Sequence, residues 1–317
     1  MAGTLKLVLA VLMVGSAVVR GSEFVNFMSI QMEAAERLQD LPNVPALAGQ
    51  LGLKSLVDLV VKAGLAPALS KPGPITVFGP TDAAFAAIPA WLKKAVEDKD
   101  VLTKVLTYHV LAGKVLSKDI KDEASAATLN GKPIRFNIYP NKAITAQCAP
   151  IDVSKVDQMA SNGVIHELKS VMIPPSGNIV EAAAACPAFK TLVTAVKAAG
   201  LVEVLSGEGP FTVFAPTDKA FQKLDPKVLD GLLKNKTALT NVLEYHVASL
   251  TYCSAGLISY NQLKMLNKMT VAIKVDGGKL KVNDATVIPL GADGSVTNGV
   301  VHAIDTVLIP PGLNLGL

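Results

Sequence analysis

The chain has 317 residues, of which 50% are hydrophobic and 18% are charged, and its formal net charge is +4 at pH 7. These proportions are typical of a globular protein and exclude a disordered chain, which is poorer in apolar residues and richer in charge. The small net charge, without a clustered stripe of Lys and Arg, argues against a nucleic-acid-binding surface. At this length we expect two hydrophobic cores of moderate size.

The N-terminal segment has the pattern of a secretory signal. Lys6 precedes an apolar run from Leu7 to Val19, and small residues follow. The run is shorter than the about 20 residues of a transmembrane helix, and it fits the hydrophobic region of a signal peptide cleaved after Ala17 or Gly21. We therefore predict a signal peptide over residues 1–21, a secreted protein, and no membrane span in the mature chain. A short membrane-anchoring segment and a cloning remnant at residues 21–24 are the alternatives.

A helical pattern opens each half of the remaining chain. Apolar residues recur at the spacing i, i+3, i+4 and i+7, which places them on one helix face. Gly64 follows the first set and Gly200 the second, and glycine commonly ends helices in the left-handed conformation. The two sets are Leu53, Leu56, Val57 and Val60, and then Phe189, Leu192, Val193 and Val196.

The next motif also occurs twice. TVFGPTDAAF begins at Thr76, and TVFAPTDKAF begins at Thr212. Each copy predicts a short strand that the proline ends, followed by a capped helix whose first inward residue is phenylalanine. The expected capping residue is Thr81 or Asp82 in the first copy, and correspondingly Thr217 or Asp218 in the second.

Each half then changes from helical to β-prone sequence. A further helical pattern ends in Tyr108-His109 in the first half and in Tyr245-His246 in the second. Alternating β-branched residues and turn signals follow at 131–146 and 267–288, and each half closes with an Asn-Gly-Val strand and a Pro-Pro stop. Helices gathered before strands favour an α+β fold.

The matching motifs lie about 136 residues apart, with a one-residue slip between the glycine pair and the Tyr-His pair. This distance is the size of an independent domain and far exceeds a solenoid repeat. We therefore predict two homologous domains in tandem, at 40–175 and 176–312.

Three motifs in this order, each present twice, resemble the signature of fasciclin-type domains. The motifs are TVFxPTDxAF, YHV and NGV[IV]H followed by IPP, and the likeness covers nearly the whole mature chain. The resemblance implies that each domain is a small β-sandwich or wedge packed with several helices. It also implies extracellular adhesion, or interaction with a cell wall or matrix. The motif residues that it marks as structural are Thr81, Asp82, Tyr108, His109, Asn162 and His166, with Thr217, Asp218, Tyr245, His246, Asn298 and His302.

We expect the repeated apolar positions to form the two cores. The residues predicted to be buried are Phe78, Phe85, Leu106 and Val164 in the first domain, and Phe214, Phe221, Leu243 and Val300 in the second.

All four histidines lie in the repeated motifs, which raises the question of metal binding or catalysis. His109 and His246 continue the apolar stripes of their helices, and His166 and His302 share strand faces with apolar neighbours. A histidine in such surroundings is most simply buried, neutral and hydrogen-bonded. Metal binding and catalysis are the alternatives.

The sequence contains no catalytic motif: it has no nucleophile elbow, zinc-binding helix motif, dinucleotide-binding turn or phosphate-binding loop. We therefore expect no enzyme, no catalytic residue, no cofactor and no metal. A hydrolase would lack a nucleophile.

Two aspartates are the candidate partner contacts. Animal members of the family carry an integrin-binding Asp-Ile pair before the NGV motif, and Asp157 and Asp293 stand at its aspartate position. Gln158 and Gly294 replace the isoleucine, which departs from that pattern; a solvated loop aspartate is the alternative. Asn235 lies in the one Asn-Lys-Thr glycosylation sequon.

Two hypotheses for the function follow. The first is a non-enzymatic tandem adhesion module whose partner is an extracellular protein or a polysaccharide matrix, in which two weak sites act together. The second is a soluble carrier of an apolar small molecule such as a carotenoid, which some algal members of the family resemble. The chain is apolar on average, with a mean hydropathy of +0.41, but aromatic residues, which commonly line apolar pockets, make up only 5%.

The three cysteines suggest one disulfide. Cys186 and Cys253 both belong to the second domain, and their counterparts, Gln50 and Leu116, are not cysteines. We predict that these two pair in an oxidising compartment, which leaves Cys148 as a buried thiol or an intermolecular link. Three unrelated small apolar residues are the alternative.

Overall fold

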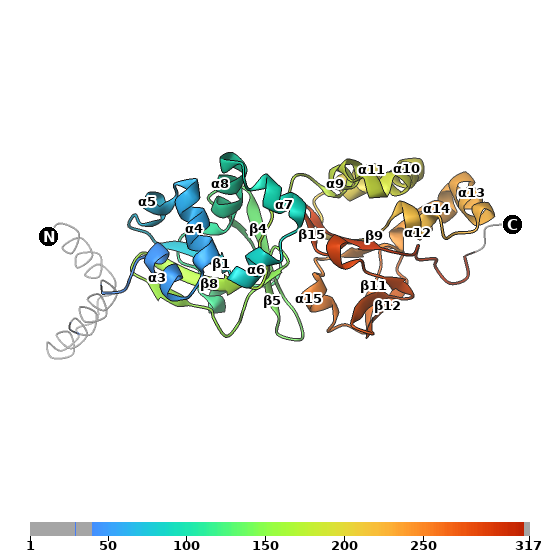
Figure 1. Ribbon diagram of the computed structural model, residues 1–317. Coiled ribbons are helices and arrows are strands. Elements are labelled where there is room, and N and C mark those ends of the chain that lie inside the picture. The colour runs from blue at the N-terminus through green and yellow to red at the C-terminus, as the bar shows by residue number, and fades with distance from the viewer. Residues whose placement is uncertain (1–28, 30–39, 314–317) are drawn as a thin grey trace, which may run out of the picture. The chain divides into compact units, whose positions relative to one another are not determined.

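The computed structural model describes Ser29 and residues 40–313, and Figure 1 shows its elements. The predicted signal peptide, residues 1–21, lies outside the described residues. Both repeats belong to the compact unit that begins at Asn43.

The first repeat consists of six helices, one 3-10 turn and eight strands over its described residues. They are α3 (Val44–Gln50), α4 (Lys54–Ala63), α5 (Ala66–Leu69), β1 (Ile75–Pro80), α6 (Asp82–Ala86), α7 (Ala90–Ala95), α8 (Lys99–Tyr108), β2 (Val110–Ala112), η1 (Ser117–Asp119), β3 (Ser125–Ala127), β4 (Pro133–Ile138), β5 (Ile144–Ala146), β6 (Ala149–Pro150), β7 (Gln158–Ala160) and β8 (Gly163–Leu168).

The second repeat runs through the same order, with the short helix α15 in the place of η1 and with two additional 3-10 turns, η2 and η3. Its elements are α9 (Ile179–Ala185), η2 (Pro187–Phe189), α10 (Lys190–Ala199), α11 (Val202–Ser206), β9 (Phe211–Pro216), α12 (Asp218–Phe221), α13 (Pro226–Lys234), α14 (Lys236–Glu244), β10 (Val247–Ser249), α15 (Ser254–Leu257), β11 (Gln262–Lys264), β12 (Thr270–Asp276), β13 (Lys279–Val282), β14 (Ala285–Thr286), η3 (Pro289–Gly291), β15 (Gly294–Val296) and β16 (Gly299–Ile304).

Each domain contains two four-stranded sheets of matching topology. In the first domain their orders are β2-β1-β8-β7 and β3-β4-β5-β6, and in the second β10-β9-β16-β15 and β11-β12-β13-β14. The central pair, β1 with β8 or β9 with β16, is parallel, and every other pair is antiparallel. The fold is α+β, as predicted, because the helices gather before the strands.

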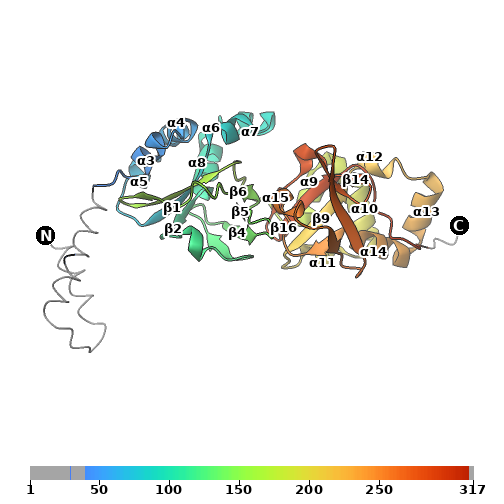
Figure 2. The ribbon, with the colours of Figure 1, turned by 90° about the horizontal axis from the view of Figure 1, so that it is seen from below.

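The parallel pair separates two apolar layers in each domain. In the first domain, Val77 and Ile165 face the helical cluster with Leu56 and Leu106, while Phe78 faces the second sheet. Successive residues of a strand point to opposite faces, so β1 serves both layers. Figure 2 shows α3 and α4 together on one side of β1 and β2.

The predicted helix ends are confirmed. Gly64 and Gly200 end α4 and α10 in the left-handed conformation, with φ values of +76° and +75°. Thr81 and Thr217 are the N-caps of α6 and α12.

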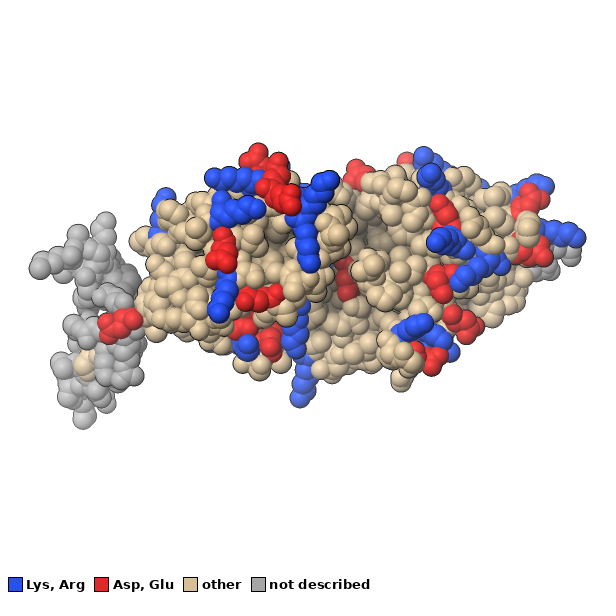
Figure 3. Space-filling view, in the orientation of Figure 1, with Lys and Arg blue, Asp and Glu red and all other residues tan. Residues whose placement is uncertain are grey.

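The described surface mixes charges of both signs, and Figure 3 shows them interspersed over the visible face. Over the described residues no single helix has the length and apolarity to cross a bilayer. The pair Ile179–Ala185 and Pro187–Ala199 reaches that level only jointly, across a bend of 104°.

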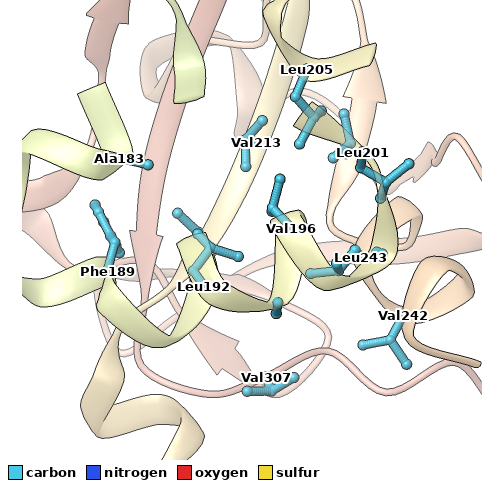
Figure 4. Close-up of a cluster of buried hydrophobic side chains, with 14 of the residues drawn as sticks. Ala183, Phe189, Leu192, Val196, Leu201, Leu205, Val213, Val242, Leu243 and Val307 are labelled. Carbon is cyan, nitrogen blue, oxygen red and sulfur yellow. The ribbon is translucent and has the colours of Figure 1, made fainter. Parts of the chain in front are cut away.

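Seven of the eight predicted core residues are buried; they are Phe78, Leu106, Val164, Phe214, Phe221, Leu243 and Val300. Figure 4 shows Leu243 inside the helical cluster of the second domain, with Ala183 and Phe189 at one end of that cluster. Phe85 is only half-buried. Its counterpart Phe221 is buried. In the second domain α13 is longer than α7, and its residues Val228 and Leu229 pack on the same cluster.

Candidate functional site

The asparagine of the NGV motif links the strands to the helices through three hydrogen bonds. Asn162 donates from Nδ2 to the carbonyls of Leu69 and Lys71, at 2.8 Å each, and its Oδ1 accepts from the Val44 N–H at 2.9 Å. Asn298 forms the same three bonds in the second domain, with Leu205, Gly207 and Ile179. These amides have no free hydrogen-bonding capacity toward a ligand except one acceptor lone pair.

The Thr-Asp pair of the repeated motif joins two helices. The Thr81 hydroxyl accepts from Ala84 N–H at 3.2 Å, and the Asp82 carboxylate accepts from Ser55 N–H, at the start of α4, at 2.8 Å. The second domain repeats the arrangement: the Thr217 hydroxyl accepts from Ala220 N–H and the Asp218 carboxylate from Thr191 N–H. A carboxylate at a helix N-terminus is stabilised by the exposed N–H groups there.

The Tyr-His pair of each domain forms hydrogen bonds that connect the helical layer to the strand-rich part of the domain. The Tyr108 hydroxyl donates to the Pro133 carbonyl, as Tyr245 does to Thr270. His109 donates from Nδ1 to Val105 O at 2.8 Å and accepts at Nε2 from Met172 N–H at 3.0 Å. Both ring nitrogens are therefore used.

His246 has the same two bonds, with Val242 and Leu308. Burial lowers the pKa of His109 to about 4 and that of His246 to about 4. Both rings are neutral near pH 7, and neither is available as a base or a metal ligand.

The strand histidines are engaged in the same way. His166 accepts at Nδ1 from Asp157 N–H and donates from Nε2 to Val115 O, and its ring stacks on Phe78 with centroids 5.4 Å apart. Burial lowers the pKa of His166. His302 accepts from Asp293 N–H, donates to Tyr252 O and stacks on Phe214. All four histidines are buried and hydrogen-bonded, as predicted.

The candidate contact aspartates are committed within their own domains. The Asp157 carboxylate accepts from the backbone N–H of Ser117 at 2.8 Å and from its hydroxyl at 2.5 Å. The Asp293 carboxylate accepts from the N–H of Ser254 at 2.7 Å and also from its hydroxyl. Both residues have a positive φ of 56°. Each carboxylate thus holds the turn before β7 or β15 against the start of η1 or α15, so its function in the fold is positional.

Asn235 is exposed and caps α14, where its Oδ1 accepts from Ala238 N–H at 3.0 Å. Glycosylation there stays a prediction.

The predicted disulfide is wrong. Cys148 bonds to Cys253, with Cα atoms 5.2 Å apart, and Cys186 is free and half-buried at the end of α9. The prediction failed because it placed both partners in one domain. The β5–β6 turn of the first domain packs instead on the segment between β10 and α15 of the second, which brings Cys148, the expected odd thiol, onto Cys253.

Hydrogen bonds surround this disulfide at the junction of the two domains. The buried Tyr139 hydroxyl donates to Thr251 O at 3.0 Å and accepts from Cys253 N–H at 2.8 Å. The Glu123 carboxylate accepts from Thr251 N–H at 2.8 Å and pairs with Arg135 at 3.2 Å. Sequence reasoning missed Tyr139 and Glu123, because nothing local marks a residue that bonds across more than 100 positions.

Potential metal ligands gather at one place within the part of the chain that the structure describes. Cys148, Cys253 and Asp293 lie within 4.8 Å of one another. The two sulfurs are bonded to each other, so they offer no thiolate to a metal.

The sequence comparisons agree with the repeated geometry. A family model described as the fasciclin domain matches residues 51–174 and 187–310. The chain is 32% identical over 249 residues to transforming growth factor-beta-induced protein ig-h3 of Sus scrofa, which covers 78% of this chain and 36% of that protein. It is 30% identical over 241 residues to human periostin, covering 75% of this chain and 28% of periostin.

A shorter relative, protein sll1483 of Synechocystis, is 48% identical over 135 residues, which is 42% of this chain and 73% of that protein. Among solved structures, a FAS1 domain pair from the insect cell adhesion molecule fasciclin I aligns over 82% of this chain and 97% of that chain, at 19% identity and a TM-score of 0.40. The chain spans little more than a third of the length of the porcine relative. Since the family model covers each repeat in turn, this chain belongs to the fasciclin domain family and carries two fasciclin domains in tandem.

Proposed function

We propose that this protein is a non-enzymatic, extracellular adhesion module whose two fasciclin domains act as one covalently closed unit on a protein or polysaccharide matrix. The observation that carries the proposal is the domain junction. The Cys148–Cys253 bond and the buried Tyr139 hydroxyl connect residues of both domains. When two weak sites lie on one unit, binding at the first site raises the effective concentration of the second site at the matrix, because the second contact is then intramolecular.

The polar motif residues support a role without catalysis. The histidine nitrogens, the motif asparagines and both loop aspartates are satisfied inside the fold. A catalytic base or nucleophile has to reach a substrate atom, and these groups point to backbone partners instead.

The disulfide supports secretion. Disulfides form and persist in oxidising compartments outside the cytosol, so the Cys148–Cys253 bond favours a secreted protein. An adhesion role is also supported by the fasciclin family to which the chain belongs.

Binding of the full chain to immobilised matrix components tests the proposal. Collagen, laminin, a neutral polysaccharide and a sulfated polysaccharide would be presented at physiological salt, with serum albumin as the reference surface. We expect saturable binding of the native chain to at least one component. Binding no stronger than that to albumin on every surface contradicts the proposal.

Two sets of variants sharpen this test. Cys148→Ala/Cys253→Ala should weaken binding at least about tenfold while each domain stays folded, because the disulfide no longer holds the two binding sites together as one unit. Asp157→Ala and Asp293→Ala test the candidate contacts, with Asp284→Ala as the matched control, since the Asp284 side chain is 99% exposed and lies outside those turns. A loss with Asp157→Ala or Asp293→Ala, and none with Asp284→Ala, would assign the contact to these turns.

A further inference from the structure

A groove of about 490 Å³ opens on the second domain beside α9. Cys186 and Phe189 line its helical side, and Ile288, Leu290 and Ala303 line the opposite side, which η3 and β16 provide. Its volume lies within the about 300–1,000 Å³ of small-molecule pockets. Ala183 and Phe189 also bound the helical core in Figure 4, so a molecule in the groove would rest on the core without opening it.

No charged side chain lines this groove: its lining consists of Ala, Gly, Val, Ile, Leu and Phe with one Thr, one Ser and one Cys. Leu290 at the rim is 96% exposed, so its side chain adds apolar surface to the mouth of the groove. Charged ligands would find no counter-charge in the lining and would lose hydration on entering. The lining therefore selects for an uncharged, mostly aliphatic molecule.

The first domain has different residues at several of the corresponding positions. Glu167 and Lys155 stand at the positions of Ala303 and Gly291 and form an ion pair with an N–O distance of 3.0 Å. Leu47 and Met159 stand where the second domain has Ala182 and Ser295, because α3 and α9 begin at the matching residues Val44 and Ile179. The same fold thus carries an ion pair at this place in one copy and an uncharged lining in the other.

We propose that the groove of the second domain is a binding site for a free, uncharged, largely aliphatic small molecule, which lies against the Cys186 thiol. The site is separate from the junction and from the adhesion role, and adhesion and small-molecule binding are measured independently.

Titration of the full chain with the neutral fluorescent probe N-phenyl-1-naphthylamine tests this site. We expect one saturable site per chain and a blue-shifted emission. The variant Ala182→Leu/Ser295→Met introduces the residues of the first domain, fills the groove without burying a charge, and should weaken the probe's affinity by about tenfold or more. Val61→Ser, which removes an exposed apolar side chain of the first domain, is the matched control and should leave the affinity unchanged.

Protection of Cys186 locates the bound probe without any groove variant. Cys186 is the single cysteine outside the disulfide, so the rate of its alkylation by iodoacetamide can be followed by mass spectrometry. We expect the saturating probe to slow alkylation by about fivefold or more, since a bound molecule displaces the reagent from the groove. A hexadecanol competitor should displace the probe more effectively than a quaternary ammonium of the same chain length.

The proposal is overturned by the absence of saturable probe binding, or by an alkylation rate that the saturating probe does not change. It is also overturned if folded Ala182→Leu/Ser295→Met binds the probe as the native chain does, where folding is established by thermal unfolding. If this variant does not fold, the protection of Cys186 in the native chain decides the question.

Discussion

The β4–β5 hairpin of the first domain and the β12–β13 hairpin of the second are counterparts with opposite surroundings. Tyr139, at the end of β4, is buried against the second domain. Asp276 stands at the matching position in the second domain, where its carboxylate pairs with Lys281 on an exposed hairpin. The β4–β5 hairpin thus forms part of the domain junction, whereas the β12–β13 hairpin is exposed to solvent.

The difference also explains why the repeat spacing, which is 137 residues at the Tyr-His pair, returns to 136 residues at the NGV motif. The turn between Tyr139 and Ala143 has three residues, whereas Gly277 and Gly278 alone connect Asp276 to Lys279. The longer turn places Asn141, whose amide donates to Ala255 O at 2.9 Å. The residues that form the junction therefore differ between the two domains, so the second domain does not repeat these contacts.

Breaking the junction should have the largest effect on stability. Cys148→Ala/Cys253→Ala removes a link across 105 positions, and the chain-entropy model gives a loss of about 4–5 kcal/mol in the free energy of unfolding. Urea unfolding followed by fluorescence measures it, and the two domains should then unfold in separate transitions. Cys186→Ala is the control and should leave the midpoint unchanged; equal midpoints for all three proteins would contradict a coupling by the disulfide.

The two motif phenylalanines should differ when truncated. Phe221→Ala is expected to cost about 3–5 kcal/mol, because it opens a cavity beneath α13, and the half-buried Phe85 should cost about half as much when replaced by Ala. Chemical unfolding of both variants measures the difference. Equal losses would show that the longer helix α13 does not shield its phenylalanine.

The buried helix histidines should make both domains acid-sensitive in the same range of pH. The pKa of His109 and of His246 is lowered from 6.5 to about 4 in the folded protein. The unfolded chain therefore binds more protons between these values, so stability is complete above pH 6.5 and falls as the pH drops toward 4. The loss is about 3 kcal/mol for each histidine.

Urea unfolding at pH 7, 5.5 and 4.5 measures this dependence. His109→Gln should be less stable at pH 7 but should show a shallower decline toward pH 4.5, because one of the two groups no longer titrates. A decline as steep as that of the native chain would contradict the assignment.

The capping threonines should have the smallest effect, equal in the two domains. Thr81→Ala and Thr217→Ala each remove one hydrogen bond to an N–H of the first helical turn, which is worth about 1 kcal/mol. Thermal unfolding of the two variants checks both the size and the equality. A clear difference between them would show that the caps are supported differently.

The sequence by itself determined the parts of this protein that depend on near neighbours. The helix ends at Gly64 and Gly200 and the caps at Thr81 and Thr217 follow from φ and from N–H groups within a few residues. The repeat of these local signals, at the spacing of a domain, was enough to predict two α+β domains and the burial of all four histidines.

Tertiary structure alone decided which surfaces meet and which remain open. Cys148 pairs with Cys253, and not Cys186 with Cys253, because a turn of one domain packs on a segment of the other, and such a contact leaves no periodic trace in either segment. Tyr139 and Glu123 reach their partners across more than 100 positions for the same reason. The groove beside Cys186 likewise exists because small residues from α9, η3 and β16 converge there, and convergence in space is a property of the fold and not of any one stretch of sequence.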